Sequence, residues 1–418
     1  MAREDEKRGG DAVIGVDVGT SSARAFAFDV RGALLGGVKV PYPWTSTPDG
    51  GVETDAERIV SATAEALDGV LARMAPAARR VIAVGTAALW HSVVGLDAGG
   101  RPITPVYPWS DTRSAGAAAR LRCELDGAEV HARTGAALHP SYLPARLRWL
   151  HDTAPAVCAQ VRWWVSAAEY LEWRLLGVRR VSYSMASGTG LLDQRSLEWD
   201  DELLAAARIS AEQLFPLADL DDTARGLQPE FADRWPALRN VPWLPAAGDG
   251  ACANVGSGCT TPERIALSLG TSGALRLLDA AADVAIPPAL WCYRLDRTSA
   301  LWGGAVSGGG NVYAWLRRTL QLPSAEELER RLAESAADDH GLTVLPFLAG
   351  ERSPYFPLDA RMSIAGVTTA TTAVEIAQAA LEAVALRLAL IRDALRRFRP
   401  DAGMIIASGA ALRHSPAW

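Results

Sequence analysis

The sequence predicts an α/β protein built from two domains, and three observations support that fold class. The chain is 418 residues long, which is more than one hydrophobic core usually organises. Apolar residues make up 49% of it, so both domains can be well packed. A short motif of glycine and hydroxyl residues occurs twice, at 17–22 and at 268–273, and each copy follows an apolar run. We expect one copy in each domain.

The first copy predicts a strand, a tight turn and a second strand. Residues 13–16 form the apolar run that leads into the turn, and residues 25–28 leave it with extended character. A further strand around 33–35 follows the turn-forming residues 29–32. The first domain is therefore expected to begin as an antiparallel meander.

Helices and strands then alternate, as they do in α/β proteins. The run Thr-Asp-Ala-Glu at 54–57 fits a capping box and opens a helix that ends near Met74. Extended structure resumes at 80–85 and again at 93–97. The segment 131–243 is richer in tryptophan, proline and helical patterns, and we expect it to form insertions over a cleft.

The second half of the sequence contains a long helix and a late strand. A second capping box at 372–375 opens an amphipathic pattern that continues to Leu395, and this helix should pack on a second sheet. An extended stretch at 404–407 follows, and the segment 408–412 comes shortly before the last residue. We expect a second domain that is incomplete at its C-terminus.

Charge and composition argue against several classes of partner. The formal net charge of −6 and a pI near 5.6 oppose binding to nucleic acid, which relies on clustered Lys and Arg. The charged tail at 1–10 lacks a secretory signal, and no run of about 18 apolar residues predicts a membrane span. We expect a cytoplasmic protein with a disordered tail and no membrane partner. Neither a disulfide framework nor a zinc site is expected from the scattered cysteines, Cys123, Cys158, Cys252, Cys259 and Cys292.

The repeated turns have the chemistry of an anion-binding loop. Glycine lets the backbone approach an anion closely, and successive N–H groups and hydroxyls donate to phosphate oxygens. Neither the lysine-bearing phosphate loop nor the glycine-rich dinucleotide turn is a convincing match, since both place phosphate at a helix N-terminus after one strand. An ordinary hairpin uses the same residues, but the repetition favours two turns that hold one polyphosphate.

A carboxylate between the two turns is the candidate catalytic base. Asp249 lies in the stretch 247–258, whose small residues allow close access of a substrate. Phosphoryl transfer to an alcohol needs a carboxylate that orients the hydroxyl and accepts its proton. The alternative is that Asp249 only caps a helix, which is a common role for aspartate. The two roles are compatible, because a cap would also aim the side chain.

The order of these motifs resembles that of the FGGY carbohydrate kinases. The motifs are D-V-G-T-S-S at 17–22, G-D-G-A-C-A-N-V-G-S-G at 248–258, L-G-T-S-G-A at 269–274 and S-G-A-A-L-R-H-S-P-A-W at 408–418. The resemblance extends over nearly the whole chain. It implies two RNase H-like domains of the actin and Hsp70 ATPase type with a cleft between them, the second one truncated at its C-terminus.

The resemblance also implies a division of labour between the domains. The N-terminal domain, 11–258, would bind the sugar, and the C-terminal domain, 259–418, would bind ATP. The segments 109–113, 133–140 and 182–190 look most similar to gluconokinases, and xylulokinase-like members come next. The implied reaction moves the γ-phosphoryl group of ATP to a sugar or sugar-acid hydroxyl. Gluconate, converted to 6-phosphogluconate, is the favoured substrate, and another sugar such as xylulose is the alternative.

The resemblance assigns roles to individual residues on the nucleotide side. Asp249 would be the base, and Asp17 would hold Mg²⁺ through water, because that ion keeps much of its hydration shell. The alternative for Asp17 is that it only caps the turn. The residues implied to contact ATP are Thr20 and Ser21 in the first turn, Gly270, Thr271 and Ser272 in the second, Gly309 and Gly310 beside the nucleotide, and Gly409 and Ala410 at the purine.

On the sugar side, the residues implied to contact substrate are Trp90, His91, Trp109, Asp111 and Arg113, together with Asp249. From the residues alone, Trp90 and His91 can equally be a core aromatic and a satisfied histidine. Arg113 can pair with a sugar carboxylate or with a structural carboxylate. Trp163, Trp164 and Trp173 are spaced like packing residues, so we assign them to the core.

Two other classes of function stay open at this point. A catalytically silent homologue would bind sugar or nucleotide without turnover. An actin-like or chaperone-type ATPase acting on proteins would use the same turns but would give the sugar-side residues no role. The expected partners are a small-molecule sugar or sugar acid and ATP, with a homodimer as an open option.

Overall fold

The computed structural model describes residues 10–75, 79–280, 285–348, 350–357 and 360–418. The chain divides into two compact units. The first comprises Met1–Cys252 together with Tyr293–Thr298, and the second comprises Ala253–Cys292 and Ser299–Trp418. The expected domain extents, 11–258 and 259–418, stay a prediction. Nearly all of the expected disordered tail, residues 1–9, lies outside the described residues.

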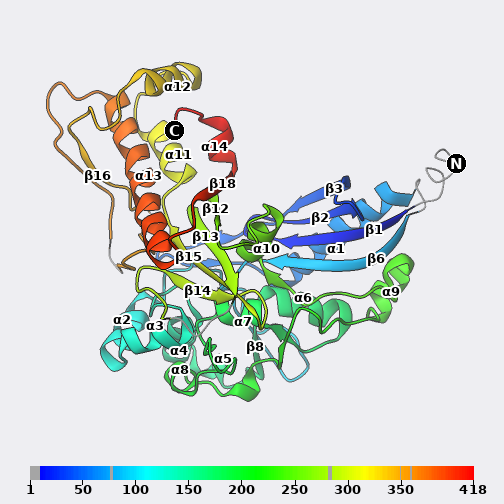
Figure 1. The fold of residues 1–418 in the computed structure, drawn as a ribbon. Coiled ribbons are helices and arrows are strands. Elements are labelled where there is room, and N and C mark those ends of the chain that lie inside the picture. Colours follow the sequence, from blue (N-terminus) through cyan, green and yellow to red (C-terminus); the bar gives the residue numbers. More distant parts are fainter. Residues whose placement is uncertain (1–9, 76–78, 281–284, 349, 358–359) are drawn as a thin grey trace, which may run out of the picture. The chain divides into compact units, whose positions relative to one another are not determined.

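A five-stranded sheet organises the first unit. Its strands are β1 (Asp11–Val18), β2 (Ser22–Asp29), β3 (Leu34–Pro41), β6 (Arg80–Ala88) and β11 (Ala247–Gly248). β1, β2 and β3 form the antiparallel meander that the sequence predicts. β6 runs parallel to β1 on its other side, and β11 runs parallel to β6. The order across the sheet is therefore β11-β6-β1-β2-β3 (Figure 1).

Helix α1 (Ala56–Met74) packs against β2 and β3 of this sheet. Its buried residues recur at helical spacing, so its apolar stripe faces the strands. The helix ends at Met74 as the sequence predicts, but the predicted capping box is wrong. Asp55 is the N-cap and accepts from the N–H of Glu57, whereas the Thr54 hydroxyl donates to the carbonyl of Pro43 at 2.8 Å.

Short helices and two-stranded ribbons complete the first unit, in keeping with the helical character predicted for 131–243. The helices are α2 (Ala115–Glu124), α3 (Gly127–Thr134), α4 (Leu143–Thr153), α5 (Pro155–Cys158), α6 (Ala167–Leu176), α7 (Tyr183–Gly188), α8 (Asp201–Ala207) and α9 (Pro229–Arg234). The ribbons pair β4 (Thr45–Ser46) with β5 (Val52–Glu53), β7 (Val94–Leu96) with β8 (Trp163–Val165), and β9 (Val181–Ser182) with β10 (Leu217–Ala218). Trp164 is buried as predicted, but Trp163 and Trp173 are only half-buried.

The second unit has its own five-stranded sheet, in the order β14-β15-β13-β12-β18. Its strands are β12 (Arg264–Leu269), β13 (Gly273–Ala280), β14 (Trp291–Arg294), β15 (Ser299–Val306) and β18 (Met404–Ser408). β12, β13 and β15 are antiparallel neighbours, and β18 runs parallel to β12. Helix α13 (Ala373–Phe398) packs on β13 and β15, and its capping box at Thr372 and Glu375 is the one that the sequence predicts.

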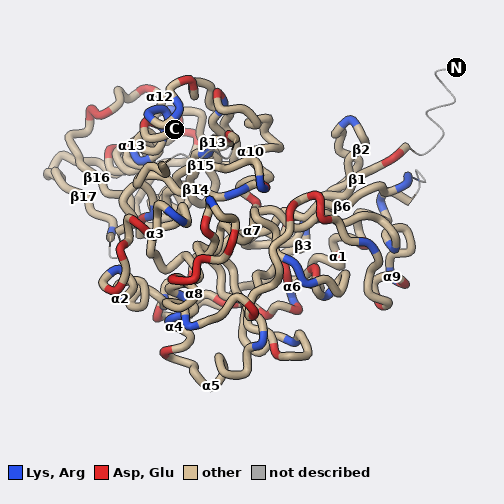
Figure 2. The backbone as a smooth tube through the Cα atoms, turned by 60° about the horizontal axis from the view of Figure 1, so that its bottom comes forward, with Lys and Arg blue, Asp and Glu red and all other residues tan. Residues whose placement is uncertain are grey.

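The remaining elements lie around these two sheets. They are α10 (Asp249–Gly256), α11 (Gly310–Thr319), α12 (Ala325–Glu334), α14 (Ala410–His414) and the pair β16 (Thr343–Leu345) and β17 (Ser363–Ala365). Acidic and basic residues are interspersed along the chain (Figure 2). Within the described ranges, no helix is both long enough and apolar enough to cross a membrane.

Candidate active site

In the first unit, three strands end side by side and bring the predicted site residues together. β1, β6 and β11 are parallel, and their register pairs Asp17 with Ala87 and Ala87 with Ala247. Their carboxyl ends therefore share one edge of the sheet. The first glycine turn follows β1, Trp90 and His91 follow β6, and Asp249 follows β11. This edge is where ligands commonly bind in α/β sheets.

The carbonyl groups of the first turn are held by two aromatic side chains. The hydroxyl of Tyr42 donates to the carbonyl of Gly19, and the indole N–H of Trp44 donates to that of Thr20. Thr20 and Ser21 are exposed, and their N–H groups make no hydrogen bond among the described residues. The turn can therefore offer amides and hydroxyls to an anion. Sequence reasoning missed Tyr42 and Trp44; the signal was an aromatic pair directly after β3.

Two carboxylates lie at this edge of the sheet. Asp17 forms an ion pair with Arg24, its partner across the hairpin, at 2.5 Å. Asp249 is the first residue of α10, and its Oδ1 accepts from the N–H of Gly250 at 2.7 Å. Burial, followed by the charges of Asp249 and Asp17, raises the pKa of the Cys252 thiol to about 12. Both carboxylates thus lie close to one thiol. Arg24 was not predicted to take part.

Trp90 fills the space beside Asp249. Its side chain is buried, and its indole N–H donates to the carbonyl of Ser184 at 2.9 Å. A Cβ atom at Gly248 would lie 1.8 Å from the indole, and one at Gly188 would lie 2.4 Å from it. These contacts match the alternative that Trp90 is a core aromatic. Trp90 therefore packs directly against the strand that precedes Asp249. A contact between Trp90 and sugar stays a prediction.

His91 belongs to a small polar and aromatic cluster. Its backbone has φ +62°, and its Nδ1 meets the carbonyl of Gly188, so Nδ1 carries a proton and donates to that carbonyl. The rings of Tyr142 and Tyr293 meet the imidazole edge-on at 5.0 and 5.7 Å. The two tyrosine hydroxyls are 2.6 Å apart. Such a set suits a ligand rich in hydroxyl groups. Neither tyrosine was predicted.

The segment after β7 holds a buried ion pair. Asp111 is 1% exposed and accepts from Arg113 at 2.5 Å, and Arg113 also reaches Glu53 at 3.1 Å. The guanidinium lies 4.8 Å from the ring of Trp149. These contacts are those of a structural ion pair, the alternative that the sequence left open for Arg113. Trp109 differs, because its indole N–H reaches the Thr20 hydroxyl at 3.5 Å; sugar binding by this segment stays a prediction.

A buried arginine that sequence reasoning missed ties the sugar-side loops together. Arg146, in α4, is fully buried and donates to the backbone carbonyl of His91 at 2.5 Å. It also donates to the carbonyls of Tyr107, Pro140 and Ser141 at 3.2 to 3.4 Å. Burial lowers its pKa to about 10. No sequence motif predicts the role of Arg146, because its partners are backbone atoms of three separate loops.

In the second unit, the equivalent turn is held by backbone donors instead. The N–H of Gly310 donates to the carbonyl of Gly270 at 2.7 Å, and the N–H of Asn311 donates to that of Thr271 at 3.2 Å. These donors open α11, which therefore starts on the turn. A Cβ atom at Gly309 would lie 2.8 Å from the carbonyl carbon of Ser272, so the approach requires glycine.

The late glycine predicted at the purine also lies at this edge. Gly409 follows β18, has φ +117°, and would place a Cβ atom 2.1 Å from the carbonyl oxygen of Leu269. Ala410 comes next and opens α14. β12 and β18 are parallel, so the predicted nucleotide residues of the second unit converge at one sheet edge. Within the described residues, the N–H groups of Thr271 and Ser272 make no hydrogen bond.

Comparison with known proteins gives consistent matches. The models of the N-terminal and C-terminal domains of the FGGY family of carbohydrate kinases match residues 12–256 and 265–418. Gluconokinase of Bacillus subtilis is 28% identical, over 90% of this chain and 75% of its own. Glycerol kinase 1 of Pseudomonas aeruginosa is 29% identical, over 94% and 82%.

Solved structures give the same picture. Gluconate kinase from Lactobacillus acidophilus matches with a TM-score of 0.89 and 27% identity, over 97% of this chain and 82% of its own. Xylulose kinase from the same organism matches with a TM-score of 0.88 and 28% identity, over 97% and 83%. The predicted fold class is confirmed by these two structures and by the family models.

Proposed function

The chain belongs to the FGGY family of carbohydrate kinases, and on that basis we propose that it phosphorylates gluconate with ATP. The observation that carries the proposal is the meeting of Asp249, Asp17 and the first glycine turn at one edge of the first sheet. Two further points favour a sugar acid. Gluconokinases are among the relatives, and the sequence motifs around Arg113 and Ser182 resemble that subfamily.

The reaction assigns each of these groups a task. A sugar hydroxyl attacks the γ-phosphorus, the bond from that phosphorus to the bridging oxygen breaks, and ADP leaves. The carboxylate of Asp249 orients the hydroxyl and accepts its proton. The hydrogen bond from Gly250 keeps the side chain of Asp249 at the start of α10. The amides of Thr20 and Ser21 donate to phosphate oxygens as negative charge shifts onto ADP.

The donor set around Asp17 fits a hydrated magnesium ion. Mg²⁺ prefers carboxylate and phosphate oxygens and retains several waters. Arg24 holds Oδ2 of Asp17, and the Oδ1 atom remains to face such an ion through water. When bound with ATP, the ion would neutralise part of the negative charge of the phosphates. In the second unit, Gly309, Gly310, Gly409 and Ala410 would accommodate the nucleotide. A cytoplasmic location is part of this proposal.

The test is ADP formation with MgATP across gluconate, xylulose, glycerol, ribulose and no sugar. We expect a signal selective for gluconate. Asp249→Asn should lower turnover by about 10²–10⁴-fold, because it removes the base and keeps the shape. Binding of ATP, measured by calorimetry, should survive. The matched control is Asp68→Asn, since Asp68 makes an exposed ion pair with Arg234 and should leave turnover unchanged.

The other outcomes of the panel are distinguishable. Selectivity for xylulose or glycerol with the same Asp249 dependence would keep the kinase chemistry and replace the substrate. Binding of gluconate and ATP without turnover would identify a silent homologue. ATP hydrolysis that does not depend on any sugar would favour an ATPase of the actin type and overturn the proposal.

A further inference from the structure

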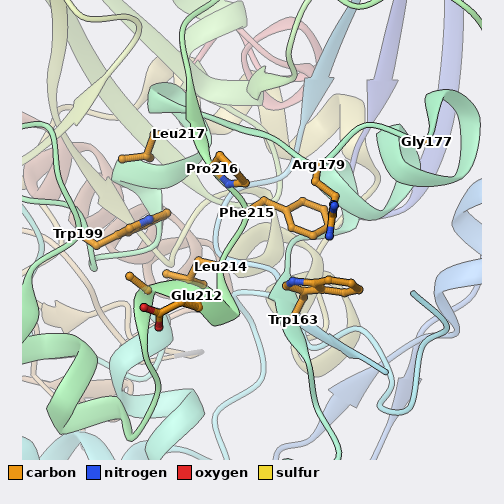
Figure 3. A pocket seen from close by; sticks show the side chains of 10 residues that line it. Trp163, Gly177, Arg179, Trp199, Glu212, Leu214, Phe215, Pro216 and Leu217 are labelled. Carbon is orange, nitrogen blue, oxygen red and sulfur yellow. The ribbon is translucent and has the colours of Figure 1, made fainter. Parts of the chain in front are cut away.

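A hollow lies in the first unit, and its lining residues are distinct from those of the candidate active site. It has a volume of about 860 Å³ and is open to solvent. Figure 3 shows its wall of Trp163, Phe215 and Arg179 on one side and Trp199 on the other. Leu214 lies between them. Ligand pockets of this size are typically lined by apolar and aromatic side chains with few polar groups, as this one is.

Arg179 is the unusual group in this wall. Its guanidinium lies 5.2 Å from the centre of the Trp163 ring, and the side chain is exposed. Among the described residues it makes no hydrogen bond and no ion pair. A guanidinium over an indole ring is attracted to the face of that ring, and this contact uses none of its N–H donors. Arg179 is therefore a cation held near an aromatic ring, and its hydrogen-bonding fork has no partner in the described part of the chain.

The other charges near the hollow already have partners. Arg162 also lies over Trp163, at 5.3 Å, but it donates to the backbone carbonyl of Glu212 at 2.9 Å. A hydrogen bond from Ser210 and the charge of Arg162 lower the pKa of Glu212. The carboxylate of Glu212 therefore accepts a hydrogen bond from Ser210, and the charge of Arg162 acts on it in addition. Figure 3 shows it on the far side of the hollow from Arg179, which has no hydrogen-bond or ion-pair partner among the described residues.

We propose that this hollow binds a small organic anion with an apolar ring, its carboxylate or phosphate on Arg179 and its ring between Trp199 and Phe215. The guanidinium fork matches two oxygens of such an anion. The aromatic walls match a ring, because offset and edge-on contacts add to the burial of apolar area. The proposal does not depend on the gluconate assignment, since none of these residues lies at the candidate active site.

The test is calorimetric titration of the full chain with 2-naphthoate as the probe. Two comparison ligands each lack one feature: naphthalene-2-methanol has the ring without the charge, and gluconate has the charge without an apolar ring. We expect 2-naphthoate to bind with Kd below about 1 mM and both comparison ligands to bind more weakly at this site. Arg179→Gln should weaken 2-naphthoate by at least about tenfold, because it removes a charge-assisted hydrogen bond.

Two control variants make the result specific. Arg225→Gln removes the same charge from an exposed arginine that donates to the Asn240 carbonyl outside the hollow, and it should leave affinity unchanged. Glu212→Gln should leave affinity unchanged or raise it. Circular dichroism melts should show that Arg179→Gln folds normally, as expected for an exposed side chain.

Several results would overturn the proposal. Equal affinity of 2-naphthoate for the Arg179→Gln and unaltered chains would do so, as would the absence of any binding near 1 mM. Binding of naphthalene-2-methanol as tight as that of 2-naphthoate would remove the anion from the description. Arg179-dependent binding of gluconate that matches 2-naphthoate would assign the hollow to a sugar acid instead.

Discussion

The two glycine-threonine-serine turns share a sequence but are held by different donors. In the first unit, the side chains of Tyr42 and Trp44 donate to the first two carbonyls of the turn. In the second unit, the backbone N–H groups of Gly310 and Asn311 donate to the corresponding carbonyls. Each arrangement turns the carbonyls away and leaves amides and hydroxyls for an anion. The same binding chemistry therefore has two structural solutions.

The difference determines how each turn can be disturbed. A side-chain donor can be removed by substitution while the backbone stays in place. A backbone donor cannot be removed in this way, but it requires close approach of two chain segments. In the second unit this approach excludes a Cβ atom at Gly309, whereas at Gly19 in the first turn the nearest atom would lie 3.5 Å away. The first turn is therefore sensitive to the loss of a side-chain donor, and the second is sensitive to added volume at Gly309.

The two sheets differ in a related way at the parallel strand beside each turn. Val84 of β6 pairs with Ile14 of β1, and Ile405 of β18 pairs with Ile265 of β12, so the two residues hold matching positions. Val84 is 0% exposed, because β11 and Trp243 continue the sheet beyond it. Ile405 is 42% exposed, since β18 is the last strand of its sheet among the described residues.

The largest expected effect comes from placing a charge at these matched positions. Val84→Lys should destabilise the first unit by about 3–5 kcal/mol, because the ammonium would be buried without a partner. Ile405→Lys should change stability by no more than about 0.5 kcal/mol and should protect the exposed edge from pairing with other chains. Urea denaturation measures the stability change of each variant. Amide hydrogen exchange in β6 and β18 then shows which strand has lost protection. An equally large loss for Ile405→Lys would mean that β18 is covered in solution.

The next effect measures where the second turn tolerates added volume and where it does not. Gly309→Ala should lower the free energy of unfolding by about 1–3 kcal/mol and weaken the binding of ATP. The reason is that its Cβ atom would meet backbone atoms of Ser272 at 2.8 Å. Gly270→Ala, with no atom within 4 Å of the added carbon, should cost less than about 1 kcal/mol without ligand. Thermal unfolding without nucleotide and calorimetry with ATP are the measurements. Comparable stability of both variants would show that α11 does not rest on the turn.

The sequence predicts those parts of the molecule that depend on local residue patterns. Alternation and turn residues give the hairpins around 17–22 and 268–273, and helical spacing with a capping box gives α13. Asp17 was named because it opens the first turn, and Asp249 because small residues surround a carboxylate between the two turns. The boundary error at α1 has the same origin, because Thr54 and Asp55 can both cap a helix and only the loop partner of Thr54 decides.

The parts that could not be predicted depend on contacts between distant segments. Arg146 acts through backbone carbonyls, which leave no trace in residue types. Tyr293 lies in the second half of the sequence, yet Tyr293–Thr298 belongs to the first unit. Trp163 has packing-like spacing but lines a hollow, because neighbouring loops do not cover it. Each case is a tertiary contact whose sequence separation exceeds any local period.

The smallest expected effect tests the side-chain donors of the first turn. Tyr42→Phe removes the hydroxyl that donates to the Gly19 carbonyl and keeps the buried ring, so the cost should be about 1 kcal/mol. The turn would then hold its carbonyls less firmly, and turnover should fall a few-fold while ATP affinity of the second unit stays unchanged. Tyr313→Phe is the matched control, since the Tyr313 hydroxyl makes no hydrogen bond among the described residues. If Tyr42→Phe matched Tyr313→Phe in both stability and turnover, the hydroxyl would not hold the turn, and the two turns would differ only in volume.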